Sequence, residues 1–123
     1  MPLLSRPFST VSAPHVPATP AHEYENAPLP GGIDTAPRTP NWDYGTNHHH
    51  WLVSEKVALT PALVNFSDQL FARRLRATMS VDDVLADVIE LLTSSGTLDN
   101  TFIIYSSDHG YDLGQFRLPS GEK

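Results

Sequence analysis

NTFIIYSSDHGYDLGQFRLPSGEK, residues 100–123, contains the strongest structural signal in this sequence. Its apolar run, Phe102–Tyr105, is followed by two serines and then by Asp108, His109 and Gly110. This order is typical of a buried strand that ends in polar ligands. In open α/β sheets, ligands bind at the carboxyl ends of strands, and glycine permits the tight turn needed there. We therefore predict a buried strand over 102–105 that presents Asp108 and His109 to a binding site.

The same residues carry a resemblance to a known family. The run from Asn100 to Pro119 follows the pattern N-T-[FY]-I-[IF]-Y-[ST]-S-D-[HN]-G-Y-x-L-G-Q-[FH]-x-L-P and resembles the sulfatase family, in particular its N-acetylglucosamine-6-sulfatase and arylsulfatase branch. The resemblance implies that Asp108 and His109 lie beside a divalent metal ion, usually calcium, that holds the sulfate ester. It also implies an α/β fold: a fragment of an alkaline-phosphatase-like sulfatase domain with one long helix, one or two strands and long loops.

Length and composition limit what the chain can do. With 123 residues it forms one domain at most, whereas a complete sulfatase is several times longer. We therefore expect residues 1–123 to be a partial catalytic domain, with a proline-rich strand and loop region over 1–59 and a helix, strand and site loop over 60–123. The net charge of −6 argues against a nucleic-acid partner, and the absence of cysteine excludes a thiolate zinc site and a thiol nucleophile.

Membrane and export signals are not evident. No apolar run approaches the roughly 18 residues of a membrane-spanning helix. The first six residues, MPLLSR, do not have the apolar core of a signal peptide. We therefore expect neither a transmembrane segment nor an export signal in this chain, although the resemblance implies that full-length relatives are secreted or lysosomal.

The first forty residues contain nine of the eleven prolines, which exclude long helices and leave room for one short strand, near Phe8 to Ser12. Alternating prolines over 13–21 predict a stiff, extended segment that carries His15. Composition alone favours a proline-rich linker here. The A-P-H-x-P-x-x-P-A pattern, however, is similar to the sulfatase segment whose histidine contacts the sulfate ester, and it implies a substrate-binding role for His15.

Residues 22–51 mix glycine, proline and aromatic residues without periodicity, which predicts an ordered surface loop. The histidines at 48–50 invite a metal interpretation, but consecutive side chains on an extended chain alternate in direction, so we favour a solvated loop. A zinc site built from His48, His49, His50 and Asp108 is the less favoured alternative. The aromatic residues are expected to pin the loop onto the core rather than bind sugar: Trp42, Tyr44 and Trp51.

Thr60-Pro61 predicts the start of a helix, because a hydroxyl cap is followed by proline at the first helical position. No proline or glycine interrupts the sequence from there to about Ser94, and Gly96 predicts the end. Apolar residues recur at spacings of three and four and predict a stripe that faces a core: Val81, Val84, Leu85, Val88, Leu91 and Leu92.

The charged residues of this helix are expected on its solvated face. Arg73, Arg74 and Arg76 form the basic part, with Asp68, Asp82 and Asp83 available as their partners. Adjacent helical residues diverge by about 100 degrees. We therefore predict that Asp82 and Asp83 are surface residues rather than a pair of metal ligands.

Several parts of a sulfatase site do not occur in the sequence. The family makes its formylglycine from a Cys/Ser-x-Pro-x-Arg motif, but there is no cysteine, and Ser12 has Val16 where the arginine belongs. The acidic pair on the family's first strand does not occur either, and Asp108 alone cannot supply the six to eight oxygen ligands that calcium takes. The family lysine falls at Glu122, so Lys123 is one position late.

These observations lead to one main hypothesis and one alternative. A complete version hydrolyses sulfate esters of sugars or glycosaminoglycans, with amino-sugar sulfates favoured over aryl sulfates, and the chain as given is inactive. In the complete version, His15 and Lys123 bind substrate, and Asp108 and His109 contact the calcium ion. The nucleophile is absent from the chain as given. The alternative is a non-catalytic remnant or truncated gene model with at most weak binding of a metal or a sulfated glycan.

Overall fold

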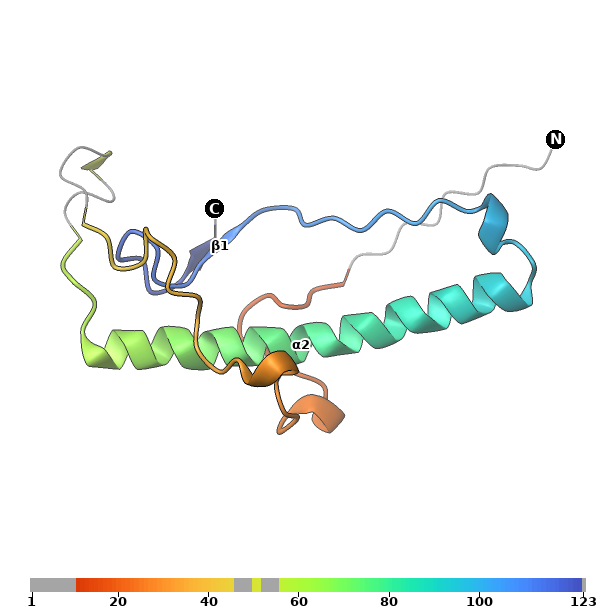
Figure 1. Cartoon of the computed structure of the whole chain (residues 1–123), viewed down its shortest axis with the longest axis horizontal. Helices are drawn as coiled ribbons and strands as arrows, with labels where there is room; N and C mark the ends of the chain where they lie inside the picture. Colours follow the sequence, from red (N-terminus) through yellow and green to blue (C-terminus); the bar gives the residue numbers. More distant parts are fainter. Residues whose placement is uncertain (1–10, 46–49, 52–55, 123) are drawn as a thin grey trace.

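The computed structural model describes residues 11–45, 50–51 and 56–122. Within these ranges the chain is built around one long helix, with the orange N-terminal segment crossing it and lying below it in the view and the blue C-terminal segment running above it (Figure 1). In order, the elements are the 3-10 helices η1 (His22–Tyr24) and η2 (Pro30–Gly32), the helix α2 (Pro61–Ser94), the 3-10 helix η3 (Leu98–Asn100), and the strands β1 (Tyr111–Asp112) and β2 (Gly121–Glu122). The strand predicted near Phe8 to Ser12 falls largely outside the described residues.

Helix α2 begins and ends where the sequence predicts. The Thr60 side chain accepts a hydrogen bond of 3.3 Å from the amide of Leu63, and Pro61 occupies the first turn. At the other end, Gly96 has a φ of +66°. The amide of Thr97 donates to the carbonyl of Leu92 at 3.0 Å, which closes the helix in a Schellman motif. Local chemistry alone accounts for both ends.

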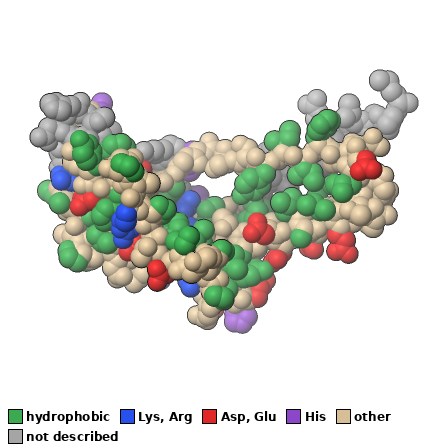
Figure 2. Space-filling view, in the orientation of Figure 1, with side chains coloured by type: hydrophobic (Ala, Val, Ile, Leu, Met, Phe, Trp, Pro, Cys, Tyr) green, Lys and Arg blue, Asp and Glu red, His purple; other side chains and the backbone are tan. Residues whose placement is uncertain are grey.

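The predicted buried strand over Phe102–Tyr105 is wrong. These residues are extended, but they pair with no strand among the described residues, and Phe102 and Ile104 are 95% and 89% exposed. The segment returns antiparallel to α2 and stands clear of it, so that the space-filling view shows an opening between the two (Figures 1 and 2). A strand needs hydrogen-bonded neighbours. In the described residues the only sheet is the antiparallel hairpin of β1 and β2, which are two residues long each, and in it Tyr111 is paired with Glu122.

The apolar stripe of α2 is covered over only part of its length. Leu70 and Ala77, in the first half of the helix, are 7% and 4% exposed. They lie beneath residues 11–45, which we call the N-terminal loop and which contribute Ala18, Leu29 and Ala36 to the same small core. The predicted burial of the second half is wrong: Val84, Val88 and Leu91 are 47%, 43% and 67% exposed. The described residues therefore cover the apolar stripe of that half only in part.

Two of the three arginines on α2 are not solvated as predicted. Arg74 donates to the carbonyl of Pro14 at 2.8 Å, and Arg76 donates to the carbonyl of Ala27 at 3.0 Å, and both are half-buried. Arg73 is exposed, as expected. The N-terminal loop offers backbone carbonyls that its own irregular conformation leaves unpaired, and long guanidinium side chains reach them.

Two acidic residues of α2, Asp68 and Asp83, also bind the N-terminal loop rather than the helix arginines. Asp68 accepts from Arg38 at 2.8 Å and from the amide of Ala36 at 2.9 Å. Asp83 accepts from the hydroxyl of Tyr24 at 2.6 Å. Asp82 and Asp83 are both exposed, which confirms that the pair lies on the surface.

Trp42 pins its loop as predicted. Its indole nitrogen donates to the carbonyl of Leu113 at 3.2 Å, its backbone forms a bridge with Gln115, and the guanidinium of Arg38 lies 4.1 Å from its ring centroid. The same expectation is wrong for Tyr44 and Trp51, which are 57% and 62% exposed. Among the described residues, no helix has the length and apolarity needed to cross a membrane.

Candidate functional site

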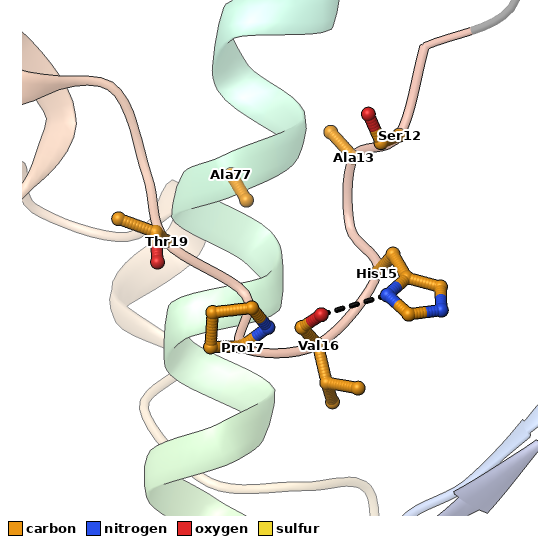
Figure 3. A pocket seen from close by; sticks show the side chains of 7 residues that line it. All are labelled: Ser12, Ala13, His15, Val16, Pro17, Thr19 and Ala77. Carbon is orange, nitrogen blue, oxygen red and sulfur yellow. Dashed lines mark hydrogen bonds between the residues drawn. The ribbon is translucent and has the colours of Figure 1, made fainter.

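His15 lies in two consecutive tight turns, not on the stiff extended segment predicted from its prolines. Its amide donates to the carbonyl of Ser12 at 2.7 Å, and its carbonyl accepts from the amide of Ala18 at 2.8 Å. The imidazole Nδ1 donates to the carbonyl of Val16 at 2.7 Å, and the ring stands on the side of the loop away from α2 (Figure 3). The ring is therefore exposed with a defined orientation.

An open hollow of about 240 Å³ lies between this loop and α2. Ala77 of α2 forms its helical wall (Figure 3). The other lining residues come from the loop: Ser12, Ala13, His15, Val16, Pro17 and Thr19. Most of the lining residues are apolar, and Ser12 and Thr19 supply hydroxyl groups.

Asp108 and His109 form a turn that faces solvent rather than a strand end that faces a crevice. Their side chains are 86% and 37% exposed. Asp108 Oδ1 accepts from the amide of His109 at 3.0 Å, and His109 Nδ1 donates to the carbonyl of Gly110 at 2.9 Å. Ser107 Oγ donates to the carbonyl of His109 at 2.7 Å. The turn is thus ordered mainly by its own polar groups, and neither Asp108 nor His109 lines the hollow beside His15.

The predicted calcium site is not complete in the described residues. They contain no group of three or more histidine or acidic side chains placed to hold one metal ion. Asp108 offers one exposed carboxylate, whereas calcium takes six to eight oxygen ligands. His50 is exposed, as the solvated-loop prediction requires, while His48 and His49 lie outside the described residues.

The hairpin brings the end of the chain back beside the Asp108 turn. The backbone of Glu122 in β2 pairs with Tyr111, which is two residues beyond His109. Lys123 lies outside the described residues. Asp112 in β1 is 3% exposed. Its carboxylate is therefore buried in the hairpin rather than displayed beside His109.

Two contacts between the N-terminal loop and α2 shift pKa values: the ion pair of Arg38 with Asp68, and the hydrogen bond of Tyr24 with Asp83. Donation by the Arg38 guanidinium lowers the pKa of Asp68, and the Ala36 amide acts in the same direction, while burial opposes them. The hydrogen bond to the Asp83 carboxylate raises the pKa of the Tyr24 hydroxyl. Both contacts fasten the N-terminal loop to α2, so they support the loop that carries His15 rather than take part in chemistry.

The sequence did not predict that one side chain, that of Arg74, contacts both the loop that carries His15 and strand β1, which follows the Asp108 turn. Arg74 donates to Pro14, which precedes His15, and its guanidinium carbon lies 3.8 Å from the centroid of the Tyr111 ring. The sequence offers no signal for this contact, because an arginine on a helix is exposed in most contexts.

Comparison with known proteins identifies the family. The sulfatase family profile matches residues 9–123, which is nearly the whole chain. The chain belongs to the sulfatase family.

Individual relatives give the same answer and show how much of a sulfatase is present. The chain is 38% identical to the N-acetylglucosamine-6-sulfatase of Bos taurus over 119 residues, which cover 94% of this chain and 21% of the relative. It is 35% identical over 125 residues to the putative extracellular sulfatase Sulf-1 homolog of Caenorhabditis elegans, covering 95% of this chain and 17% of that one. An arylsulfatase of Volvox carteri is 35% identical over 88 residues, 63% of this chain and 14% of its own.

The chain therefore spans about a fifth of the length of the first two of these relatives. No solved structure matches it significantly.

Proposed function

We propose that a longer protein containing this chain hydrolyses sulfate esters of sugars, with amino-sugar sulfates or glycosaminoglycans as substrates. The observation that carries the proposal is the family match over residues 9–123, which includes both the His15 loop and the Asp108 turn. The 38% identity to an N-acetylglucosamine-6-sulfatase favours an amino-sugar sulfate over a simple aryl sulfate. The chain itself supplies binding groups and no nucleophile, because it has no Cys/Ser-x-Pro-x-Arg motif.

The chemistry of His15 suits a sulfate oxygen. Because Nδ1 donates to a backbone carbonyl, the neutral ring carries its proton there, and Nε2 is an acceptor. In the imidazolium form Nε2 becomes a donor and the ring carries a positive charge. Protonated His15 would therefore bind a sulfate ester through a charge-assisted hydrogen bond. The fixed Nδ1 contact would also hold the ring in one orientation.

The Asp108 turn is the second element of the proposal. We infer that Asp108 contributes one oxygen ligand to a calcium ion whose other ligands lie outside this chain. Its carboxylate is 86% exposed, which supports this role, and its Oδ2 lies 3.7 Å from Nε2 of His109, which forms an ion pair with it when the imidazole is protonated. His109 would then contact the sulfate group rather than the calcium ion, because imidazole is a poor ligand for a hard cation. Lys123, which follows Glu122 in the sequence, is proposed to contact the same sulfate.

For the chain taken alone, one observation supports the alternative, a non-catalytic protein. The Asp108 turn faces solvent, and the described residues gather no three metal ligands. An isolated chain of this kind would bind calcium or a sulfated glycan at most weakly. The names of two relatives include the word extracellular, which supports a proposed location outside the cell for the longer protein.

The test measures sulfate release by two proteins. The first is the 123-residue chain, and the second is the product of the longest reading frame that contains it, both assayed with N-acetylglucosamine 6-sulfate and with p-nitrophenyl sulfate. We expect no release by the chain alone and release by the longer protein, with the amino-sugar sulfate preferred. In the longer protein, Asp108→Ala should abolish activity, and His15→Ala should raise KM.

Matched controls are available for both substitutions. Asp99→Ala removes another exposed acidic side chain, and His22→Ala removes another exposed histidine. Neither should change the kinetics. Sulfate release by the 123-residue chain itself would overturn the proposal, as would a longer protein with no sulfatase activity.

A further inference from the structure

We propose that Arg74 is a positioning residue that holds the His15 loop and the Asp108 turn at a fixed spacing. The inference rests on the proposed function, since it concerns the two segments to which substrate-binding and metal-binding roles are assigned there. It is carried by two contacts of one guanidinium, made to segments that are far apart in the sequence.

The first contact orders the His15 loop. Arg74 Nη1 donates to the carbonyl of Pro14 at 2.8 Å, across 60 residues of sequence. Pro14 is bonded directly to His15, and its carbonyl belongs to the peptide group that leads into it. Ala77, almost one helical turn after Arg74, lines the hollow on the helix side of the same loop (Figure 3). The loop is therefore seated on a short stretch of α2.

The second contact orders the other segment. The Arg74 guanidinium carbon lies 3.8 Å from the centroid of the Tyr111 ring, within the range of a cation–π interaction. Tyr111 begins β1, two residues beyond His109, and its backbone pairs with Glu122. The hairpin is thus anchored to the helix residue that also holds Pro14.

Only arginine makes both contacts at once. A guanidinium is planar, so one face can stack on an aromatic ring while its N–H groups donate in the plane. A lysine ammonium is a compact charge without such a face. Because α2 is a continuous helix from Pro61 to Ser94, its backbone provides a rigid base for this side chain. In a complete site, displacement of either segment by about 1 Å would cost much of the rate.

The test uses histidine ring signals in two-dimensional NMR spectra of the 123-residue chain, assigned by single His→Gln variants. No sulfate, metal or activity is needed, so the experiment succeeds or fails separately from the proposed hydrolase activity. We expect Tyr111→Leu to move the His15 ring signals by more than a line width and Tyr111→Phe to leave them in place. We expect Arg74→Ala to move the signals of both His15 and His109.

The controls match each change in chemistry. Arg73→Ala removes the neighbouring exposed arginine, and Tyr105→Leu removes a tyrosine that is 74% exposed. Neither should move His15. In an Arg74→Ala background, Tyr111→Leu should no longer move His15, because the connection has already been cut.

Two outcomes would overturn the proposal. One is a His15 signal that stays in place in both Arg74→Ala and Tyr111→Leu. The other is a Tyr111→Leu effect on His15 that persists unchanged without Arg74, which would mean that the two segments influence each other directly. If Arg74→Ala also moves His22 and so disturbs the whole loop, the comparison of Tyr111→Leu with Tyr111→Phe decides.

Discussion

Replacement of Gly114 by alanine should release the loop that Trp42 anchors. Gly114 lies between β1 and β2 with a φ of +112°, a region that side chains rarely adopt. Its carbonyl accepts from the amide of Asp43 at 2.8 Å, and its amide donates to the carbonyl of Leu118 at 2.7 Å, so the backbone is held in this conformation. A methyl group built here would overlap the Trp42 indole, with Cδ1 and Cε2 only 2.7 and 2.8 Å away.

The magnitude follows from two costs. Holding a non-glycine residue at this φ costs about 1–3 kcal/mol. Moving the indole out of the way loses its hydrogen bond to Leu113, worth about 1 kcal/mol, and its contact with Arg38, worth about 0.5–1 kcal/mol. We therefore expect a loss of about 2.5–5 kcal/mol, a large share of the stability of a small protein.

The assay compares three glycines in a Trp51→Phe background, in which fluorescence reports on Trp42. Gly96 has a φ of +66° with no atom near an added methyl, and Gly110 has open space and no positive φ. Thermal unfolding should show almost no loss for Gly110→Ala, about 1 kcal/mol for Gly96→Ala, and the full loss for Gly114→Ala. The Trp42 emission should shift to the red only in the last. Equal losses for Gly96→Ala and Gly114→Ala, with Trp42 emission unchanged, would refute the steric argument.

Three further predictions concern acid stability, the exposed segment and a buried hydroxyl. The pKa of Asp68 is lowered in the folded chain, so its contact with Arg38 stabilises the fold above about pH 4, and this stabilisation is lost as the pH falls through the lowered pKa. When the melting temperature is measured between pH 6 and pH 2, it should therefore fall less steeply with decreasing pH in Asp68→Asn than in the unchanged chain. Ile104→Ser should change stability by less than about 0.5 kcal/mol, and a denaturant-measured loss of about 2 kcal/mol or more would show that Ile104 is buried. Ser67→Ala should cost about 1–2 kcal/mol by the same measurement, because a fully buried hydroxyl donates to the carbonyl of Pro119 at 2.7 Å; an unchanged midpoint would contradict this.

What the sequence predicted well is what short-range chemistry decides. Both ends of α2 follow from residues within one turn of the end, namely Thr60-Pro61 and Gly96. Membership of the sulfatase family was equally predictable, because the run from Asn100 to Pro119 is contiguous in the sequence and can be recognised without knowing how the chain folds.

What the sequence did not predict depends on partners that are distant along the chain or not among the described residues. The apolar run at 102–105 has the composition of a buried strand, but a strand is defined by its neighbours, and the described residues provide none for it. The roles of Arg74 and Arg76 were missed for the opposite reason. Their partners are backbone carbonyls of a loop about 50–60 residues earlier in the sequence, and a carbonyl has no sequence signature.

The described contacts divide the candidate site into a supported half and an unsupported half. Hydrogen bonds from other segments reach α2 at residues between Ser67 and Asp83, and the His15 loop is seated on this stretch. Beyond it, the apolar residues Val84, Val88 and Leu91 of α2 are exposed, and the segment over 102–105 pairs with no strand among the described residues. The Asp108 turn joins that unpaired segment to the hairpin, so its anchor to α2 is on the Tyr111 side. If the proposed calcium ion binds in a longer protein, the ordering of this turn should therefore come with the covering of residues 101–107, whereas the His15 side is already formed in this chain.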